Sequence, residues 1–416
     1  MAERNWAENL TFSAATVEHP RDLEELRAVI AGAPRVRVLG ARHSFNAIAD
    51  SSELVSLREL SSGIDYDGGA GTVTCGAGVT YGALARELTR AGLALANLPS
   101  LPHVSVAGAI ATATHGSGNG LGNLATSVEG LELITSTGEL IGIRRGDPDF
   151  AGAVVHLGAL GAVTRVTLRV EPSYDVRQEV FEHLSWDALE PHFEELMALG
   201  DSVSVFTTWG EAAGRVWVKR RSDRPGVSDL GKTVFGARAA GRQLHPIDGG
   251  DPSACTPQLA AAGPWNERLP HFRPEFTPSA GEELQSEYLL ARRDGVAAIA
   301  ALRSLRAQIR PLLHVSEIRT VAGDDLWLSP EYGRDSVAIH FTWQRRQREV
   351  ERVLETLEQA LEPFAPRPHW GKLFVTPRAV LAARYEHLDD FRALAARLDP
   401  RGAFSNGWLE QRLLGD

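Results

Sequence analysis

The pattern of apolar and polar positions changes character near residue 173. Before this point the chain alternates over short stretches. We predict strands over 36–40, 71–78, 130–143 (a hairpin) and 162–172, and helices over 22–32 and 80–92. Thr80 and Gly92 are the residue types that commonly begin and end a helix. This part is therefore predicted to be built on small sheets with few helices.

Beyond residue 173, longer helical patterns alternate with strand patterns. Helices are predicted over 185–200, 295–309 and 349–364, and strands over 202–209, 214–221, 284–290, 315–322, 336–343 and 370–375. Residues 223–270, rich in Gly, Pro and Arg, are predicted to form an irregular insertion. The pattern favours an α+β protein in which one large mixed or antiparallel sheet is backed by helices. We expect domains at 1–173 and 174–375, with segment 376–416 returning to the first domain.

Composition narrows the function. The chain has 416 residues and a net charge of −10, which argues against binding to nucleic acid or an anionic membrane. The first ten residues, MAERNWAENL, lack the pattern of a signal peptide, and no apolar stretch approaches the length of a membrane-spanning helix. Two cysteines far apart indicate neither a disulfide framework nor a thiolate metal site. We expect a cytoplasmic protein with no bound metal.

Glycine-rich segments are the candidates for a cofactor site. The segment GAGVTYG (76–82) follows a predicted strand, but its glycine spacing and the absence of a later acidic residue exclude a nicotinamide Rossmann site. The segment 104–123, VSVAGAIATATHGSGNGLGN, concentrates small residues whose backbone can approach a ligand closely. Together with VLGARHS (38–44) and LGALGAVT (157–164), it predicts several backbone segments lining one extended ligand, with a diphosphate held by amides.

These segments carry a resemblance. VLGARHSFN, SLPHVSVAGAIATATHGSG and GALGAVT resemble the FAD-binding domain of the vanillyl-alcohol oxidase superfamily. EIRTVA, HFTW and RPHWGK are similar to its alditol oxidase branch, which acts on xylitol, sorbitol and related polyols. The similarity spans nearly the whole chain. It implies a two-domain fold of this superfamily, with an N-terminal FAD-binding domain of the PCMH type and a substrate domain.

The resemblance also implies how FAD is held. It makes His43 the residue bonded covalently to the flavin, with Arg42 before it where the family more often has glycine. Chemically, a neutral imidazole can serve as the nucleophile for such a bond. The other residues expected to line the cofactor come from the glycine-rich segments and the C-terminal tail: Arg37, Val38, Leu39, Gly40, Ala41, Ser44, Ser100, Ser105, Gly108, Thr112, Ala113, Thr114, His115, Val163 and Asn406.

A second group of residues points to a polar substrate pocket. Glu317 and Arg319 lie two apart in a predicted strand, so they share a face, and valines flank them there. Buried charges of this kind need polar partners, which a polyhydroxylated ligand supplies. Lys372 stands between Trp370 and Phe374 in a chain with only three lysines among 43 basic residues, which favours a functional role.

The resemblance implies that this second group binds the alditol over the flavin. The residues concerned are Ser100, Gln285, Glu317, Arg319, His340, Thr342 and Lys372. We expect Arg319 and Lys372 to stabilise alkoxide character at the terminal hydroxyl, with Glu317 and His340 as further catalytic groups. Either Lys372 or His340 can take the hydroxyl proton, and the sequence leaves both open.

The expected reaction converts the alditol to the aldose by hydride transfer to flavin N5, and O₂ then reoxidises the flavin to give hydrogen peroxide. Pro99 occupies the position that gates oxygen in the family, and a proline there is compatible with oxygen access. The partners expected are thus a small polyol and O₂, for a chain that is monomeric. The alternative is an aldonolactone oxidase or dehydrogenase of the same superfamily, which carries a similar HW-x-K segment.

Overall fold

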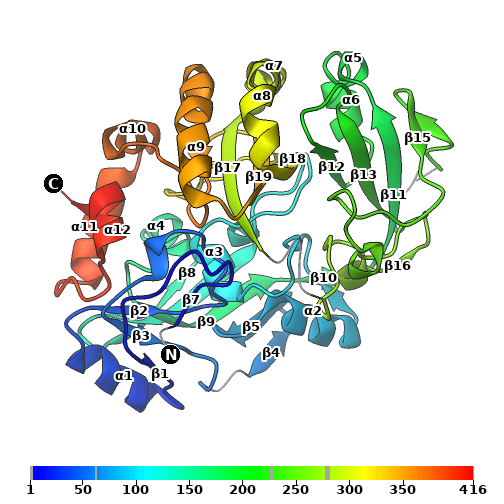
Figure 1. The fold of residues 1–416 in the computed structure, drawn as a ribbon. Helices are drawn as coiled ribbons and strands as arrows, with labels where there is room; N and C mark the ends of the chain where they lie inside the picture. Colours follow the sequence, from blue (N-terminus) through cyan, green and yellow to red (C-terminus); the bar gives the residue numbers. More distant parts are fainter. Residues whose placement is uncertain (1–2, 61–62, 225–228, 277–281, 416) are drawn as a thin grey trace.

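The described N-terminal part of the chain contains three small sheets built from short strands. One of them is the antiparallel pair of β6 Leu93–Ala94 and β10 Glu171–Pro172. The computed structural model describes residues 3–60, 63–224, 229–276 and 282–415. A parallel sheet has the order β1-β3-β2, and a five-stranded antiparallel sheet has the order β4-β5-β9-β7-β8 (Figure 1). Their bounds are β1 Val17–Glu18, β2 Val36–Val38, β3 Glu53–Val55, β4 Ile64–Asp67, β5 Thr72–Gly76, β7 Val128–Ile134, β8 Leu140–Arg144 and β9 Ala162–Arg169.

The α-helices of this part are α1 Leu23–Gly32, α2 Tyr81–Arg90, α3 Val106–Ala111 and α4 Phe150–Val154. The first two lie within the predicted helices 22–32 and 80–92, whereas α3 and α4 were not predicted. The Thr80 side chain accepts a hydrogen bond from the amide of Ala83, and Gly92 has a positive φ of 72° after the last turn of α2. Both predicted caps of this helix are therefore confirmed.

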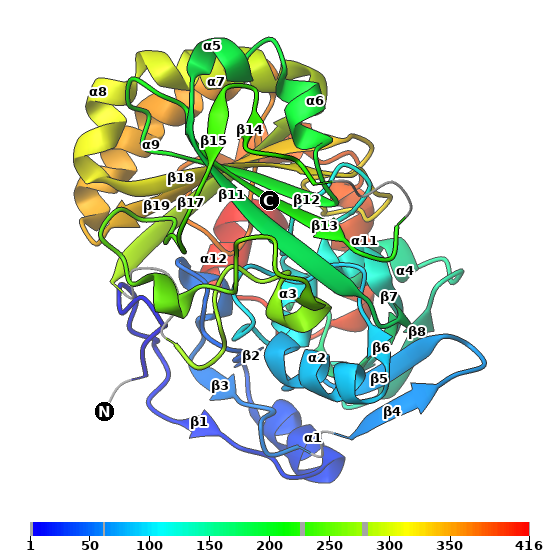
Figure 2. The same ribbon diagram turned by 90° about the vertical axis from the view of Figure 1, so that its right-hand side faces the viewer.

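The larger part of the chain forms a ten-stranded sheet of order β14-β15-β11-β13-β12-β18-β19-β17-β20, with β16 paired to β11. The strands are β11 Asp175–Leu184, β12 Ser202–Thr207, β13 Gly214–Arg221, β14 Thr233–Val234, β15 Ala237–Ala239, β16 Gly263–Pro264, β17 Glu283–Ala291, β18 Leu313–Val321, β19 Ser336–Gln344 and β20 Arg367–Pro368. The helices accompanying it are α5 Trp186–Leu189, α6 Phe193–Met197, α7 Gly295–Ser304, α8 Arg306–Ile309 and α9 Gln347–Leu361. Figures 1 and 2 show these helices on the side away from the N-terminal sheets, which confirms the predicted large sheet backed by helices.

Three details differ from the predictions. The predicted helix 185–200 is divided into α5 and α6 around Pro191, because proline lacks the N–H that a continuous helix needs. The predicted strand 370–375 is absent: the chain turns there, with the amide of Lys372 bonded to the carbonyl of His369 at 3.1 Å. Strand β11 was not predicted, since buried polar residues such as Gln178 hide its alternation. Of the predicted insertion, residues 225–228 lie outside the described residues.

The C-terminal segment packs against the N-terminal part. It contains α10 Arg378–Arg384, α11 Leu388–Leu398 and α12 Gly407–Leu409. The amide of Val36, at the start of β2, donates to the carbonyl of Ala403 at 2.7 Å. The Asn406 side chain donates to the carbonyls of Ala47, Ile48 and Asp50 at 2.8–3.1 Å. These bonds hold the loop that follows β2.

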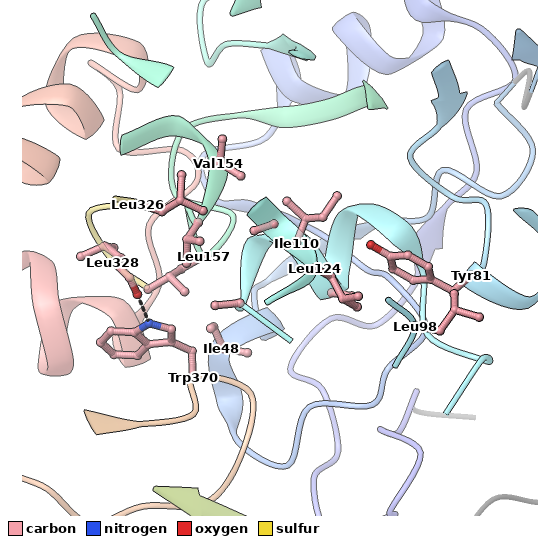
Figure 3. Close-up of a cluster of buried hydrophobic side chains, with 14 of the residues drawn as sticks. Ile48, Tyr81, Leu98, Ile110, Leu124, Val154, Leu157, Leu326, Leu328 and Trp370 are labelled. Atoms are coloured by element: carbon pink, nitrogen blue, oxygen red, sulfur yellow. Dashed lines mark hydrogen bonds between the residues drawn. The ribbon is translucent and has the colours of Figure 1, made fainter. Parts of the chain in front are cut away.

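Buried apolar side chains join the two parts of the molecule. Figure 3 shows Ile48, Ile110 and Leu157 of the N-terminal part in one cluster with Leu328 and Trp370. The Trp370 indole is fully buried and donates to the carbonyl of Leu328 at 2.7 Å. This bond anchors the turn that carries Lys372. Among the residues that the structure describes, no helix is long and apolar enough to cross a bilayer.

Candidate active site

A deep cavity lies where the N-terminal part meets one face of the large sheet. Its volume is about 300 Å³. Ligand pockets usually measure about 300–1,000 Å³, so this cavity has the size of a ligand-binding site. Its walls contain nearly all of the predicted site residues, from both the glycine-rich segments and the strands β17, β18 and β19.

The N-terminal wall is built mostly from backbone and small side chains. A Cβ on Gly40 or on Gly108 would lie 2.7 Å from Ser105 Oγ, so the wall has been kept free of side chains at both positions. Such a wall lets a flat, extended ligand approach the backbone closely. The predicted cofactor residues that line it are Arg37, Val38, Leu39, Gly40, Ala41, Arg42, His43, Ser44, Ser100, Ser105, Gly108, Thr112, Thr114, His115 and Val163.

Two predicted cofactor residues do not line the cavity. Ala113 is fully buried behind it, and Asn406 bonds the loop after β2 from the C-terminal segment. Arg37 does line it, but its guanidinium donates to four backbone carbonyls, those of Ile48, Leu157, Gly158 and Phe404. These residues thus shape the wall: Arg37 and Asn406 tie its separate backbone segments together.

His43 occupies the cavity wall in an unusual state. Its Nδ1 is buried and has no hydrogen-bond partner among the described residues. Burial, with the nearby charges of His103 and Arg42 adding to it, lowers the pKa of His43 to about 4. The imidazole is therefore neutral at physiological pH and carries a nucleophilic nitrogen. An orphaned polar atom on a wall shaped for a flat ligand fits the attachment of a flavin there.

The opposite wall holds a buried ionic cluster centred on Glu287. Its carboxylate accepts from Arg319 at 2.5 Å and from Lys372 Nζ at 2.6 Å, and His115 Nε2 lies 3.3 Å away. Burial alone would raise the pKa of Glu287, but Lys372, Arg319 and His115 outweigh burial and hold it well below its usual value. The pKa of Lys372 is lowered, chiefly by burial. The cluster is thus a carboxylate clamped between two cations.

Glu317 heads a second chain of polar contacts. His271 Nε2 lies 2.8 Å from the Glu317 carboxylate, and His271 Nδ1 lies 3.1 Å from Lys219 Nζ. Lys219 also donates to the carbonyls of Leu269 and Pro270. A carboxylate only accepts, so His271 Nε2 carries the proton toward Glu317 and its Nδ1 accepts from Lys219. Lys219 is fully buried, and burial lowers its pKa to about 7.

The remaining predicted substrate residues face the same space. Lys372 Nζ lies 2.8 Å from His340 Nδ1, and His340 Nε2 lies 3.1 Å from the Thr342 hydroxyl. Arg319 reaches Ser100 Oγ at 3.4 Å. Gln285 lines the cavity beside them. The expected grouping of Glu317, Arg319, His340, Thr342, Lys372, Ser100 and Gln285 is found in one cavity.

Several polar residues that line the cavity were not among the predicted ones; those beside the ionic cluster are Glu287, His271 and His369. Glu287 was detectable, because it lies two residues after Gln285 in β17 and so shares its face. The register pairs Glu287 with His340, and His340 with Glu317, across adjacent strands. His271 gave no signal, because it lies in the irregular region after the insertion. The expected placement of Lys372 between aromatic neighbours on a strand face is wrong, since a turn carries it instead.

Comparisons with known proteins agree with this architecture. Residues 14–144 match the FAD binding domain family, and residues 282–412 match the family described as D-arabinono-1,4-lactone oxidase. An alditol oxidase from Streptomyces sp. is 48% identical, with 100% of this chain and 99% of that protein aligned. An L-gulono-1,4-lactone dehydrogenase from Mycobacterium tuberculosis is 29% identical, covering 99% and 98%. An L-gulonolactone oxidase from Bos taurus is 26% identical, covering 98% and 97%.

Among solved structures, cholesterol oxidase from B. sterolicum has a TM-score of 0.80 at 18% identity, covering 99% of this chain and 96% of that one, which shows a shared fold. Fold and cavity together define an FAD-dependent oxidoreductase with an N-terminal FAD-binding domain. The chain belongs to the same family as the Streptomyces alditol oxidase, as its sequence predicted.

Proposed function

We propose that this protein oxidises the terminal hydroxyl of alditols, such as xylitol and sorbitol, to the corresponding aldose with FAD as the electron acceptor. The observation that carries this proposal is the buried cluster of Glu287, Arg319 and Lys372, which opens into the same cavity as the glycine-lined wall and His43. The greater identity to the alditol oxidase than to the two lactone enzymes supports the choice of substrate class.

The pocket suits a neutral ligand with many hydroxyl groups. Its two carboxylates and two cations already balance one another, so a charged substrate would leave a charge without a partner. Hydroxyl groups both donate and accept, and charged partners give them the stronger hydrogen bonds. Glu317 then accepts from a substrate hydroxyl, while Ser100, Gln285 and Thr342 bind others along the chain.

FAD supplies the acceptor for a hydride from the substrate carbon. Around it, Arg319 and Lys372 hold the terminal hydroxyl oxygen and stabilise the negative charge that grows there. Glu287 fixes both cations at one point. The proton passes to Lys372 or to His340 Nδ1 beside it, and both remain candidates. Lys372→Met should lower the rate of flavin reduction more than it weakens polyol binding.

The proposal includes a covalent bond between His43 and the flavin, and reoxidation by O₂ with release of hydrogen peroxide. The orphaned Nδ1 and the neutral imidazole of His43 support the bond. Pro99 lines the cavity and has no flexible side chain with which to close it, which supports oxygen access. The remaining cavity-lining residues would hold the cofactor through their backbone.

We further propose the domain division given above: FAD domain 1–173, substrate domain 174–375, and segment 376–416 returning to the first. The sheets on either side of residue 173 and the bonds of Asn406 support it. A cytoplasmic monomer completes the proposal. The two free, buried cysteines are consistent with a reducing compartment.

Steady-state assays of hydrogen peroxide release test the function. Xylitol and sorbitol should give a higher kcat/KM than L-gulono-1,4-lactone and L-galactono-1,4-lactone. The second candidate, an aldonolactone oxidase, is favoured by the family match over residues 282–412. Higher kcat/KM for the lactones would establish that alternative and refute the proposal. Peroxide from neither class would refute both.

A further inference from the structure

The N-terminal segment 3–12 crosses the outside of the loop that carries His43. The indole ring of Trp6 stacks on the His43 imidazole, with ring centroids 5.0 Å apart and planes inclined by 27°. The Trp6 amide donates to the carbonyl of Arg42 at 2.8 Å. On the other side, the Asn5 side chain donates to the carbonyl of Ser44 at 2.9 Å. The segment is therefore hydrogen-bonded to the backbone on both sides of His43.

The backbone at Arg42, which segment 3–12 contacts, is strained. Arg42 has a φ of +64°, in the left-handed region that glycine adopts readily and other residues seldom do. Its guanidinium forms an ion pair with the carboxylate of Glu3. The contacts from Glu3 and Trp6 thus hold Arg42 in a conformation that its own side chain disfavours. Contacts with segment 3–12 thus stabilise at Arg42 a backbone conformation that a glycine would adopt without such contacts.

The same contacts fix the imidazole of His43. Because Nδ1 has no hydrogen-bond partner among the described residues, no hydrogen bond at that atom sets the orientation of the ring. The stacked face of Trp6 is the contact that sets it. The opposite side of the loop lines the cavity. The indole thus packs against an imidazole that lines the space where a flavin would lie.

We propose that Trp6 is a positioning residue for covalent attachment of the flavin to His43, an inference that rests on the linkage proposed above. Linkage joins one imidazole nitrogen to a methyl carbon of the flavin ring, and an N–H and a C–H bond break. The two electrons and two protons reduce the flavin ring, and O₂ then takes them up as hydrogen peroxide. Trp6 takes no part in the bonds that form or break; it packs against the imidazole ring and fixes its orientation.

The experiment compares the full chain with Trp6→Leu, Trp6→Phe and Trp327→Leu. Trp327 is the matched control, because it too is partly buried and stacks on a histidine, His387, at 5.5 Å, but neither residue lines the cavity. Each protein is incubated with excess FAD, then precipitated in acid, and the flavin that stays with the chain is measured against the total bound before precipitation.

We expect wild type and Trp327→Leu to bind most of their flavin covalently. Trp6→Leu should still bind FAD but form the covalent bond at least fivefold more slowly, and Trp6→Phe should recover most of the rate. Equal rates in Trp6→Leu and wild type would overturn the inference. Wild type without covalent flavin would instead refute the linkage itself, and the inference with it.

If Trp6→Leu fails to fold or binds no FAD, the Glu3→Gln variant tests whether segment 3–12 positions His43. The Glu3 side chain is 31% exposed, so this change leaves the core intact and removes the ion pair with Arg42. We expect covalent attachment at least twofold slower with an unchanged melting temperature. An unchanged rate would overturn the role of the segment.

Discussion

Neutralising Glu287 should destabilise the protein strongly, because its carboxylate balances two cations in the interior. In Glu287→Gln, Arg319 and Lys372 face each other without the charge that separates them. Removing one partner of a buried ion pair costs about 3–5 kcal/mol. For 416 residues, the entropy of unfolding is about 0.9 kcal/mol per K. The melting temperature should therefore fall by about 3–6 °C.

Glu129→Gln is the matched control for this experiment. Glu129 also bridges two cations, Arg145 at 3.2 Å and Arg169 at 2.6 Å, but its side chain is 24% exposed. Solvent-exposed ion pairs contribute about 0–1 kcal/mol, so we expect a shift of about 1 °C or less. Differential scanning calorimetry of the FAD-bound proteins measures the melting temperatures of both variants and of the wild type. Equal shifts in the two variants, or a Glu287→Gln protein as stable as wild type, would refute the reasoning.

Three further predictions follow from the same contacts. Lys219→Met removes the hydrogen-bond donor to His271 Nδ1 and loosens the ring that positions Glu317, so the KM for polyols should rise at least tenfold with normal flavin content; an unchanged KM would contradict this. Gly158→Ala places a Cβ 2.8 Å from a buried guanidinium in the cavity wall and should lower bound FAD, measured by absorbance. Gly138 has a similar positive φ, +82° against +72°, with open space around it, so Gly138→Ala should retain FAD; equal losses would count against the proposed wall. Burial lowers the pKa of His271 and of His340 to about 4, against an ordinary 6.5. The unfolded chain then binds more protons between these values, so stability should fall as pH drops from about 6.5 to about 4. A melting temperature that stays constant over that range would show that these rings are not buried as neutral groups.

The sequence predicted the strands of the site better than it predicted the partners on them. Strand β18 was recognisable because Glu317 and Arg319 alternate with apolar residues, and alternation is a local property. Which residue faces them depends on strand register, and register here joins Glu317 to His340, 23 positions on, and Glu287 to His340, 53 positions on. The contacts of Glu287 with Arg319 and Lys372 therefore emerged only in the fold, where β17 and β18 flank β19.

Two other features of the structure differ from what the sequence predicted or go beyond it. The residues around Lys372 alternate like a strand, but the buried indole of Trp370 and the amide of Gly371, which donates to His369 Nδ1 at 3.1 Å, turn the chain instead. The role of His43 was assigned from the resemblance of its segment to the FAD-binding family, whereas the contact with Trp6 joins two separate segments. The chemistry of each segment was predictable, and the contacts between segments were not.

Anaerobic reduction of the bound flavin tests the central claim most directly. The purified protein is mixed with xylitol in the absence of oxygen, and the flavin absorbance near 450 nm is followed in a stopped-flow instrument. The account predicts complete bleaching by xylitol in the wild type, and bleaching at least a hundredfold slower in Lys372→Met. A flavin that stays yellow with xylitol and sorbitol, yet bleaches with an aldonolactone, would contradict it.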